Sequence, residues 1–315
     1  LHEILKWKPD FLGITSTTIA ISNAAIIANM VKKSSPNIIN LIGGSHFTAE
    51  PEATMQKFPD FDIGIIGEGD LTILELLESL INRTELNKVK GIVYRKNGSL
   101  SRTPSRSFIN DLDSLPKPAY HLLPNLVKHY SPPPHAIKRY PGTSMITSRG
   151  CPSKCNFCAN FFGTKFRHYS AEYIIEVVLR LKNDFGINEI NFVDDTFVVN
   201  KKRVKQICDL LINRNIDLSW SCEAKVNFVN PEMLKLMKKA GCWQIAYGIE
   251  TGSQDILDSI DKGTTLKQAE DAMKWSKQAG IETRGFFMIG SPGETKGTIT
   301  ETINFIKKVE LDDFH

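Results

Sequence analysis

The sequence predicts an α/β protein made of a partial N-terminal parallel αβ domain and a partial barrel of βα units. Short apolar runs alternate with longer segments of helical spacing in both halves of the 315 residues. Such alternation favours parallel strands covered by helices. Hydrophobic residues make up 41% of the chain and charged residues 23%, which supports a core and excludes disorder throughout. We expect the αβ domain over 1–81, a hairpin and proline-rich linker over 82–140, and the barrel over 141–315.

The first domain is expected to alternate strands with helices. The expected strands are Phe11–Thr15, Ile38–Ile42 and Asp62–Ile66, and the expected helices are Ile19–Lys33 and Leu71–Leu80. Ligands of a parallel sheet bind beyond the carboxyl ends of its strands. Those ends carry Thr15-Ser16, Gly43-Gly44 and Gly67-Glu68-Gly69, which are therefore candidate binding segments.

The segment that follows reads as a hairpin and a wrapping linker. Gly91–Tyr94 and Ser107–Ile109 are expected to pair around an Asn97-Gly98 turn. Prolines then recur from Pro116 to Pro134, which favours an extended linker over a packed core.

The second half repeats strand and helix at barrel-like spacing. The expected strands are Thr143–Ser148, Glu189–Val193, Asp217–Ser221, Gln244–Ile249 and Thr283–Ile289, and the expected helices are Ala171–Asp184, Lys201–Asn213, Pro231–Ala240, Leu266–Ala279 and Lys296–Val309. These units predict a barrel or part of one. Leu311–His315 reads as the approach to a sixth strand, so we expect a partial (β/α)6 barrel. Because the chain opens at Leu1 within an expected helix end and stops at this approach to a strand, we expect the first domain to be truncated N-terminally and the barrel C-terminally.

Charge and hydropathy exclude several kinds of partner. The net charge of +4 comes without a dense Lys/Arg block, so no nucleic-acid partner is expected. Phe11–Val31 lacks charged residues and is long enough to span a bilayer, but its Thr, Ser and Asn residues favour a strand and a helix. We therefore expect no transmembrane segment and a cytoplasmic protein.

The six cysteines do not resemble a disulfide framework. Cys208 and Cys242 lie in apolar surroundings and are expected to pack in the core. If Glu223 points into the barrel, strand alternation turns its neighbour Cys222 outward.

The strongest signal is the run RGCPSKCNFC over Arg149–Cys158, just after the first expected barrel strand. Its thiolates at Cys151, Cys155 and Cys158 suit an iron–sulfur cluster or zinc. Three ligands would hold three irons of a 4Fe–4S cluster and leave the fourth iron open. The alternative is a structural zinc site with His168 as fourth ligand, although this spacing is atypical of zinc sites.

The CxxxCxxC spacing, with Phe157 before the last cysteine, resembles the signature of radical SAM enzymes. In that family the open iron binds S-adenosylmethionine (SAM), and one electron from the cluster yields a 5′-deoxyadenosyl radical. The resemblance implies a radical SAM barrel with the cluster on the three cysteines and Phe157 near the adenine. The later strand ends resemble the branch that includes methylthiotransferases and cobalamin-dependent members. They read NFVDDTF over 191–197, WSCEA over 220–224, YGIETGS over 247–253 and GFFMIGSPGET over 285–295.

The resemblance implies further cofactor-binding residues at these strand ends. Asp194 and Asp195 occupy the place of the Gly-Gly-Glu turn that meets the SAM amino group in many members, from which this chain departs. Glu223 and Glu250 are candidates for the ribose hydroxyls or the substrate. The turn at Gly290 would let backbone approach the adenine. Each carboxylate could instead be a solvated strand end or a helix cap.

The first domain resembles the Rossmann-like cobalamin-binding domain of cobalamin-dependent radical SAM enzymes, through Leu41–His46 and Ile66–Asp70. The resemblance implies that Ser16 or Thr18 lies near the nucleotide loop of cobalamin. It also implies that the nucleotide tail of cobalamin passes close to the backbone at Gly43 and Gly44.

The sequence also bears on three other assignments for the first domain. A nicotinamide dinucleotide is disfavoured because Thr72 occupies the third glycine position of the fingerprint and the next strand lacks a ribose-binding acid. His46 is expected to pack or to hydrogen-bond at its turn rather than bind cobalt. The domain could also be vestigial and bind nothing.

These observations predict a cobalamin-dependent radical SAM enzyme that methylates an unactivated carbon. The alternatives are a radical SAM cyclase, rearrangement or oxidation enzyme with the same domains, and a non-catalytic zinc-binding module. Ferredoxin or flavodoxin would supply the electron, and the substrate would be a small molecule or a peptide. No catalytic residue for the substrate itself can be named from the sequence.

Overall fold

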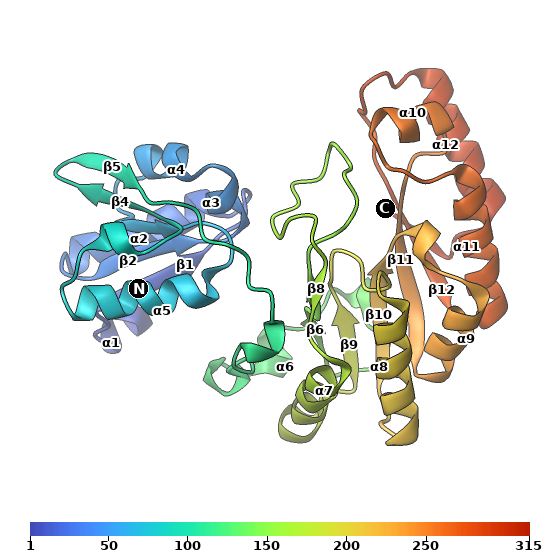
Figure 1. The fold of residues 1–315 in the computed structure, drawn as a ribbon, viewed down its shortest axis with the longest axis horizontal. Coiled ribbons are helices and arrows are strands. Elements are labelled where there is room, and N and C mark those ends of the chain that lie inside the picture. Colours follow the sequence, from blue (N-terminus) through green and yellow to red (C-terminus); the bar gives the residue numbers. More distant parts are fainter. The chain divides into compact units, whose positions relative to one another are not determined.

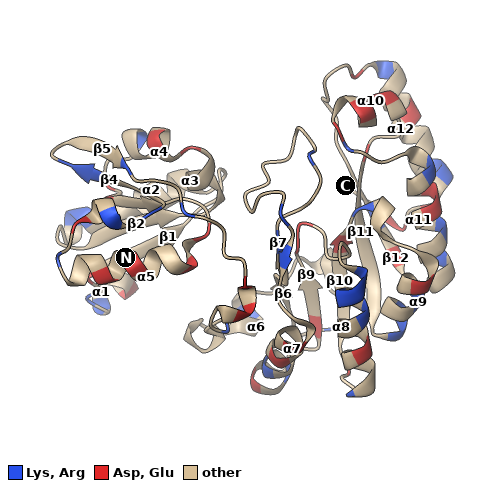
Figure 2. Ribbon diagram, viewed as in Figure 1, with Lys and Arg blue, Asp and Glu red and all other residues tan.

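The computed structural model describes all residues, 1–315, and divides into two compact units, Leu1–Asn110 and Asp111–His315. Figure 1 shows that each unit has its own sheet and its own helices. Lys and Arg are interspersed with Asp and Glu along these helices (Figure 2). None of the helices is both long enough and apolar enough to cross a bilayer.

The first unit is a five-stranded sheet with the order β1-β2-β3-β4-β5. Its strands are β1 (Phe11–Thr15), β2 (Ile39–Gly43), β3 (Ile63–Ile65), β4 (Ile92–Lys96) and β5 (Ser99–Arg102). Its helices are α1 (His2–Lys6), α2 (Ile21–Ser34), α3 (Ser45–Ala49), α4 (Pro51–Lys57) and α5 (Gly69–Ile81), with a 3-10 turn η1 (Leu86–Lys88). β1, β2 and β3 are parallel. The Rossmann-like domain expected from the sequence is present.

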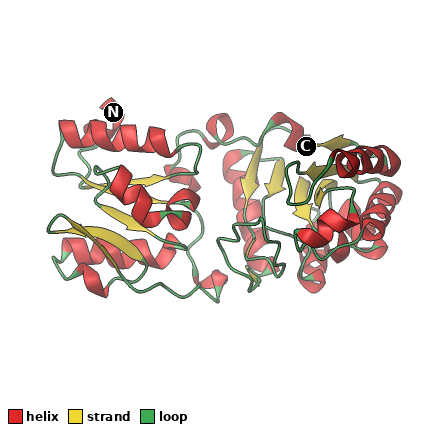
Figure 3. Cartoon of the chain, turned by 90° about the horizontal axis from the view of Figure 1, so that it is seen from above, coloured by secondary structure: helices red, strands yellow, loops and turns green.

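Helices cover both faces of this first sheet, as Figure 3 shows. On one face Ile42 packs with Phe47 and Phe61, and on the other Leu41 packs with Leu76. Both faces of β2 are therefore apolar, which is why this strand has a continuous apolar run in the sequence rather than an alternating one.

The hairpin confirms the expected turn but not the expected return strand. Asn97 and Gly98 have φ of 50° and 79°, the left-handed pair that a two-residue hairpin turn requires. So short a turn brings the chain back at once, and β5 begins at Ser99 rather than near Ser107. β4 pairs antiparallel with both β3 and β5, so the hairpin joins the first sheet and makes it mixed.

The second unit contains a six-stranded parallel sheet with the order β13-β12-β11-β10-β9-β6. Its strands are β6 (Gly142–Met145), β9 (Glu189–Phe192), β10 (Ser219–Ala224), β11 (Cys242–Glu250), β12 (Glu282–Phe287) and β13 (Asp313–Phe314). Its main helices are α7 (Ala171–Phe185), α8 (Lys201–Asn213), α9 (Pro231–Lys239), α10 (Gln254–Ser259), α11 (Leu266–Ala279) and α12 (Lys296–Val309). A separate pair, β7 (Ser148–Arg149) and β8 (Arg167–His168), closes the base of the cysteine loop. Sequential parallel strands joined by helices confirm the expected partial (β/α)6 barrel.

Residues 111–140 pack with this second unit and contain only short helical pieces. These are η2 (Leu112–Ser114), η3 (Tyr120–Leu122), α6 (Leu126–His129) and η4 (Pro134–Ala136). Leu126 is buried in the main core, and the backbone N–H groups of Lys138 and Arg139 donate to the buried carboxylate of Glu189. Buried contacts of this kind hold the proline-rich segment against the barrel.

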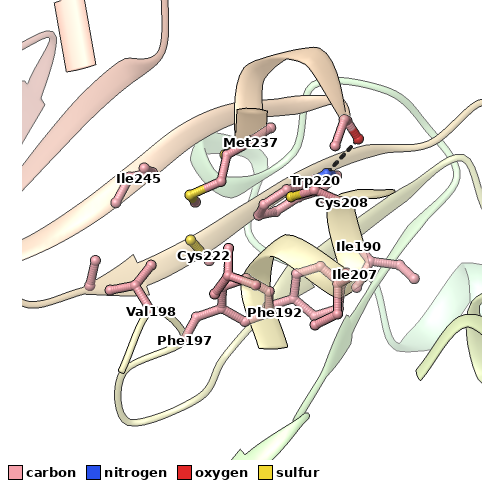
Figure 4. Packing of buried hydrophobic residues seen from close by; sticks show 14 of the residues in the cluster. Ile190, Phe192, Phe197, Val198, Ile207, Cys208, Trp220, Cys222, Met237 and Ile245 are labelled. Carbon is pink, nitrogen blue, oxygen red and sulfur yellow. Dashed lines mark hydrogen bonds between the residues drawn. The ribbon is translucent and has the colours of Figure 1, made fainter. Parts of the chain in front are cut away.

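The main core lies between the barrel strands and their helices. Trp220 packs edge-on against Phe192, and its Nε1 donates to the Ala240 carbonyl at 2.8 Å (Figure 4). A buried indole needs such an acceptor to avoid leaving its N–H unpaired. Cys208, Cys222 and Cys242 are at most 1% exposed in this core, as expected for packing residues.

Candidate active site

One cavity in the second unit lies beside the cysteine loop and the carboxyl ends of the barrel strands. Its walls include all three clustered cysteines together with Asp195, Glu223, Glu250 and the ring of Phe157. Because the barrel strands are parallel, their polar ends meet at one edge of the sheet. The structure thereby brings together most of the site residues that the sequence predicts in the barrel.

Cys151, Cys155 and Cys158 are free thiols that line this cavity. The Cys151 N–H donates to Gly163 O at 3.1 Å, and the Cys158 N–H donates to Cys155 O at 3.1 Å. These bonds fold the loop so that its thiols face one space. In the structure the three thiols are not close enough together to form a closed set of metal ligands. Three soft thiolates from one loop are a donor set that fits an iron–sulfur cluster.

Gly150 fixes the entry to the cysteine loop. Its φ is 87°, and a Cβ there would lie 2.5 Å from the Lys165 carbonyl. A side chain at this position would therefore force the loop open. The sequence shows the glycine, but the close approach that requires it comes from the fold.

The cysteine loop is docked on the end of α10 through Asn156. The Asn156 N–H donates to Ile260 O at 3.1 Å, and its Nδ2 donates to Ser259 O at 2.8 Å. The neighbouring Phe157 ring lies 5.7 Å from the Lys262 Nζ. Asn156 therefore anchors the stretch of chain between the second and third cysteines.

Asp194 does not line the cavity, and its assignment to cofactor binding remains a prediction. Its carboxylate accepts from the Thr147 N–H, from Thr147 Oγ1 at 2.5 Å and from the Ser148 N–H at 2.8 Å. It also forms a buried ion pair with Arg203 at 3.7 Å. These partners occupy the carboxylate and hold the strand end from which the cysteine loop departs.

Asp195, the next residue, does line the cavity. Its Oδ2 accepts from the Gly150 N–H at 3.1 Å, which ties the strand end to the loop entry. Partial burial is the main cause of a raised pKa for this carboxyl, and the nearby Asp194 acts in the same direction. The two aspartates lie beyond the end of β9 at Phe192, and their side chains have different surroundings.

Glu223 lines the cavity from the end of β10. Burial raises its pKa to about 7, and the carboxylates of Asp194 and Asp195 add to the shift. Its neighbour Cys222 faces the core, as strand alternation predicts once Glu223 points into the barrel.

Glu250 ends β11 in a left-handed conformation, with φ of 71°. That conformation is uncommon for a residue with a side chain and is kept only where the surroundings enforce it. Its Oε1 lies 2.6 Å from the Lys262 Nζ, and both side chains are buried. Its carbonyl accepts from the Met288 N–H at 2.8 Å. Glu250 therefore reaches the cavity as one half of a buried ion pair.

Two lysines that no sequence motif predicts, Lys225 and Lys262, also line the cavity. Lys225 Nζ donates to Ser153 Oγ at 2.9 Å, and burial lowers its pKa. Burial also raises the pKa of the Cys155 thiol, while the ammonium groups of Lys262 and Lys225 act in the opposite direction. Lys225 stands two residues after Glu223, so strand periodicity was the one available signal for it.

Gly290 does not line the cavity. It sits in an exposed turn with φ of 100°, and its N–H donates to the Glu294 carboxylate. The expected approach of its backbone to an adenine therefore remains a prediction.

In the first unit, the expected binding segments meet at the carboxyl ends of β1 and β2. The Ser16 N–H donates to Gly43 O at 3.1 Å, and its buried hydroxyl donates to Thr17 O at 2.9 Å. A Cβ on Gly44 would lie 2.6 Å from Thr15 Oγ1, so Gly44 is needed for the two turns to touch. The nearest atom to a Cβ on Gly43 would be 3.9 Å away, which leaves room beside that residue.

Thr18 and His46 lie at the same edge of the first sheet. Thr18 is exposed, and its Oγ1 lies 3.1 Å from the Nδ1 of His46. The His46 N–H donates to Ser16 O at 3.2 Å. These contacts agree with a histidine that hydrogen-bonds at its turn.

Comparison with known proteins is informative for both units. Residues 145–306, just over half of the chain, match the radical SAM superfamily, and residues 1–77 match the B12 binding domain. An uncharacterized methyltransferase of Pyrococcus horikoshii is 39% identical over 311 residues, which are 98% of this chain and 66% of that protein. The anaerobic magnesium-protoporphyrin IX monomethyl ester cyclase of Rubrivivax gelatinosus is 28% identical over 308 residues, which cover 96% of this chain and 54% of the cyclase. The chain thus spans about half to two thirds of these relatives.

The fold is shared with a solved structure as well. The radical S-adenosylmethionine methyltransferase TsrM of Kitasatospora setae superposes with a TM-score of 0.81 at 17% identity, over 99% of this chain and 63% of TsrM. The radical SAM match implies a 4Fe–4S cluster and SAM, and the B12 match implies cobalamin. With its three-cysteine loop at the open edge of a partial barrel, the chain belongs to the radical SAM superfamily.

Proposed function

We propose that the protein to which this chain belongs is a cobalamin-dependent radical SAM C-methyltransferase. The observation that carries the proposal is the single cavity that joins the three thiols with the carboxyl groups at three barrel strand ends. The relative from Pyrococcus horikoshii is described as a methyltransferase, which supports methyl transfer as the outcome.

Bound cofactors would supply the reactive chemistry, with the cluster and SAM giving a 5′-deoxyadenosyl radical and cobalamin carrying the methyl group. The protein's part is to hold the groups and to exclude competing reactions. Cys151, Cys155 and Cys158 would ligate the cluster, and Phe157 would lie against the adenine. Ser16, Thr18, Gly43 and Gly44 would line the path of the cobalamin tail. Because Asp194 is fully engaged, we assign it to holding the loop rather than a cofactor.

The cavity carboxyl groups would orient SAM. Asp195 is positioned to accept a hydrogen bond from an ammonium group, because its Oδ2 already faces the loop entry at Gly150. Glu223, with a pKa of about 7, is able to present either an acceptor or an O–H donor to a ribose hydroxyl or the substrate. Glu250 is held by Lys262, so its remaining oxygen is the one available to a ligand.

The surroundings of the reaction follow from the same proposal. The substrate would be a small molecule or a peptide whose unactivated carbon receives the methyl group. Ferredoxin or flavodoxin would deliver the electron in the cytoplasm.

The test uses the full-length parent protein, reconstituted without oxygen with iron, sulfide and cobalamin. We would quantify 5′-deoxyadenosine and S-adenosylhomocysteine after adding SAM and dithionite. Cys151→Ala is expected to lose the cluster absorption and both products. Cys208→Ala is the matched control, because it removes a thiol that is buried in the core away from the cavity, and it should keep both. Equal activity of the two variants would refute the assignment of the cysteine loop.

Two other functions are kept because specific observations favour them. The resemblance to the cyclase of Rubrivivax gelatinosus favours a radical reaction without methyl transfer, for which 5′-deoxyadenosine would form without S-adenosylhomocysteine. The three thiols would also suit zinc in a non-catalytic module. That function would give a colourless protein that contains zinc and does not cleave SAM.

A further inference from the structure

Lys225 is a buried cation whose partner in the structure is a neutral hydroxyl. The residue follows β10 and is 9% exposed, and its Nζ donates to Ser153 Oγ at 2.9 Å. The other lysine of the cavity, Lys262, is buried to a similar degree but forms an ion pair with Glu250 at 2.6 Å. The two lysines therefore differ in that Lys262 forms an ion pair, whereas Lys225 forms none, although the carboxylate of Asp261 also favours the charged form of Lys225.

A buried ammonium group without a counter-ion is unfavourable, because desolvation is not offset by attraction to a negative charge. Ionisable groups in such environments cluster at functional sites, and the ligand that would offset a buried ammonium group is an anion. Ser153, the partner of Lys225, lies between Cys151 and Cys155 in the loop. Among the nearby charges, the thiolate form of Cys155 favours the charged form of Lys225 most, Lys262 opposes it, and Cys151 and Asp261 also favour it. The anion expected beside Lys225 is therefore one held by these cysteines.

We propose that Lys225 is the counter-ion of the iron–sulfur cluster and raises its reduction potential. This inference rests on the proposed function, because it requires a cluster on the three cysteines. When an external reductant gives up one electron, the cluster gains one negative charge and no bond forms or breaks. A fixed positive charge in a site of low dielectric stabilises that more negative form. Lys262 contributes less, because the charge of Glu250 offsets its own.

The decisive measurement is the midpoint potential of the cluster in the full-length reconstituted protein, followed by electron paramagnetic resonance during a dithionite titration without SAM. Lys225→Gln is expected to shift the potential to more negative values while iron content stays unchanged. Lys225→Arg should restore most of the shift, since it retains the charge. Lys154→Gln is the matched control, because it removes an exposed lysine from the same loop, where water screens the charge.

Two outcomes would overturn the proposal. The first is a wild-type potential in a fully loaded Lys225→Gln protein, and the second is an equal shift in Lys154→Gln. If Lys225→Gln takes up no cluster, thermal unfolding of the metal-free proteins tests whether Lys225 is an unpaired buried charge. Lys225→Met should then unfold at a higher temperature than wild type, because it removes an unpaired buried charge, and an equal or lower temperature would overturn the inference. Failure of the wild type itself to take up iron would count against the proposed function, and the metal-free comparison would still test Lys225.

Discussion

The Nζ of Lys262 lies 2.6 Å from Oε1 of Glu250, and the two side chains are 8% and 9% exposed. This pair joins the end of β11 to the turn after α10, the same turn on which Asn156 docks the cysteine loop. A buried pair of this kind adds little net stability, but removal of one partner leaves the other charge unpaired. Glu250 and Lys262 are therefore expected to be energetically coupled.

We predict that Glu250→Gln and Lys262→Gln each destabilise the metal-free protein by about 3 kcal/mol. The double variant should lose clearly less than the sum of the two, because it leaves no unpaired charge. Urea unfolding of the four proteins at neutral pH measures the coupling. Strictly additive losses would contradict the buried ion pair.

The stability of the protein is expected to depend on pH through the protonation of the Glu223 carboxyl group. Its pKa of about 7 in the folded protein exceeds the ordinary value of 4.5, chiefly because burial disfavours the charged form. Between these pH values the folded state retains a proton that the unfolded state has released. Stability therefore falls as the pH rises from about 4.5 to about 7, by roughly 3 kcal/mol for this group, and levels off above that range.

Glu223→Gln should remove this dependence, so the variant should gain stability over wild type as the pH rises from 5 to 8. Thermal unfolding of both metal-free proteins at several pH values makes the comparison. Glu301→Gln, which changes an exposed glutamate on α12, is the control and should follow the wild-type profile. Parallel profiles of Glu223→Gln and wild type would show that Glu223 does not titrate in this range.

The bounds of several barrel helices could be predicted closely because the residues that cap a helix can be recognised in the local sequence. The bounds expected for α8, α11 and α12 agree with the structure. Asn200, Thr265 and Thr295 cap these three helices, each accepting a hydrogen bond from the N–H three residues later. Capping depends on neighbours in sequence, so it can be recognised without the fold.

The site could be predicted only in part. The spacing of the cysteines is local, whereas the partners of Lys225 and Glu250 depend on segments that meet only after folding. Asp194 and Asp195 show the same limit. They are identical neighbours at one strand end, yet Arg203 and Thr147 occupy the first while the second faces the cavity. Both lie beyond the end of β9 at Phe192, so which of the two faces inward depends on how the chain turns after the strand, and the dipeptide alone does not specify it.

The last prediction concerns Asn156, which docks the cysteine loop on α10. Asn156→Asp keeps the size of the side chain but replaces the Nδ2 donor with a carboxylate oxygen facing the Ser259 carbonyl at about the same distance. Repulsion between the two oxygens should release the loop between Cys155 and Cys158. We expect the reconstituted variant to hold less iron and to lose it faster to a chelator. Lys154→Ala, an exposed change in the same loop, is the control and should retain iron as wild type does. The two hydrogen bonds that dock Asn156 lie within the second unit and are far in sequence from the first sheet. Thermal unfolding of the metal-free Asn156→Asp protein should therefore change little. Normal iron retention in Asn156→Asp would mean that the loop holds its shape without this anchor.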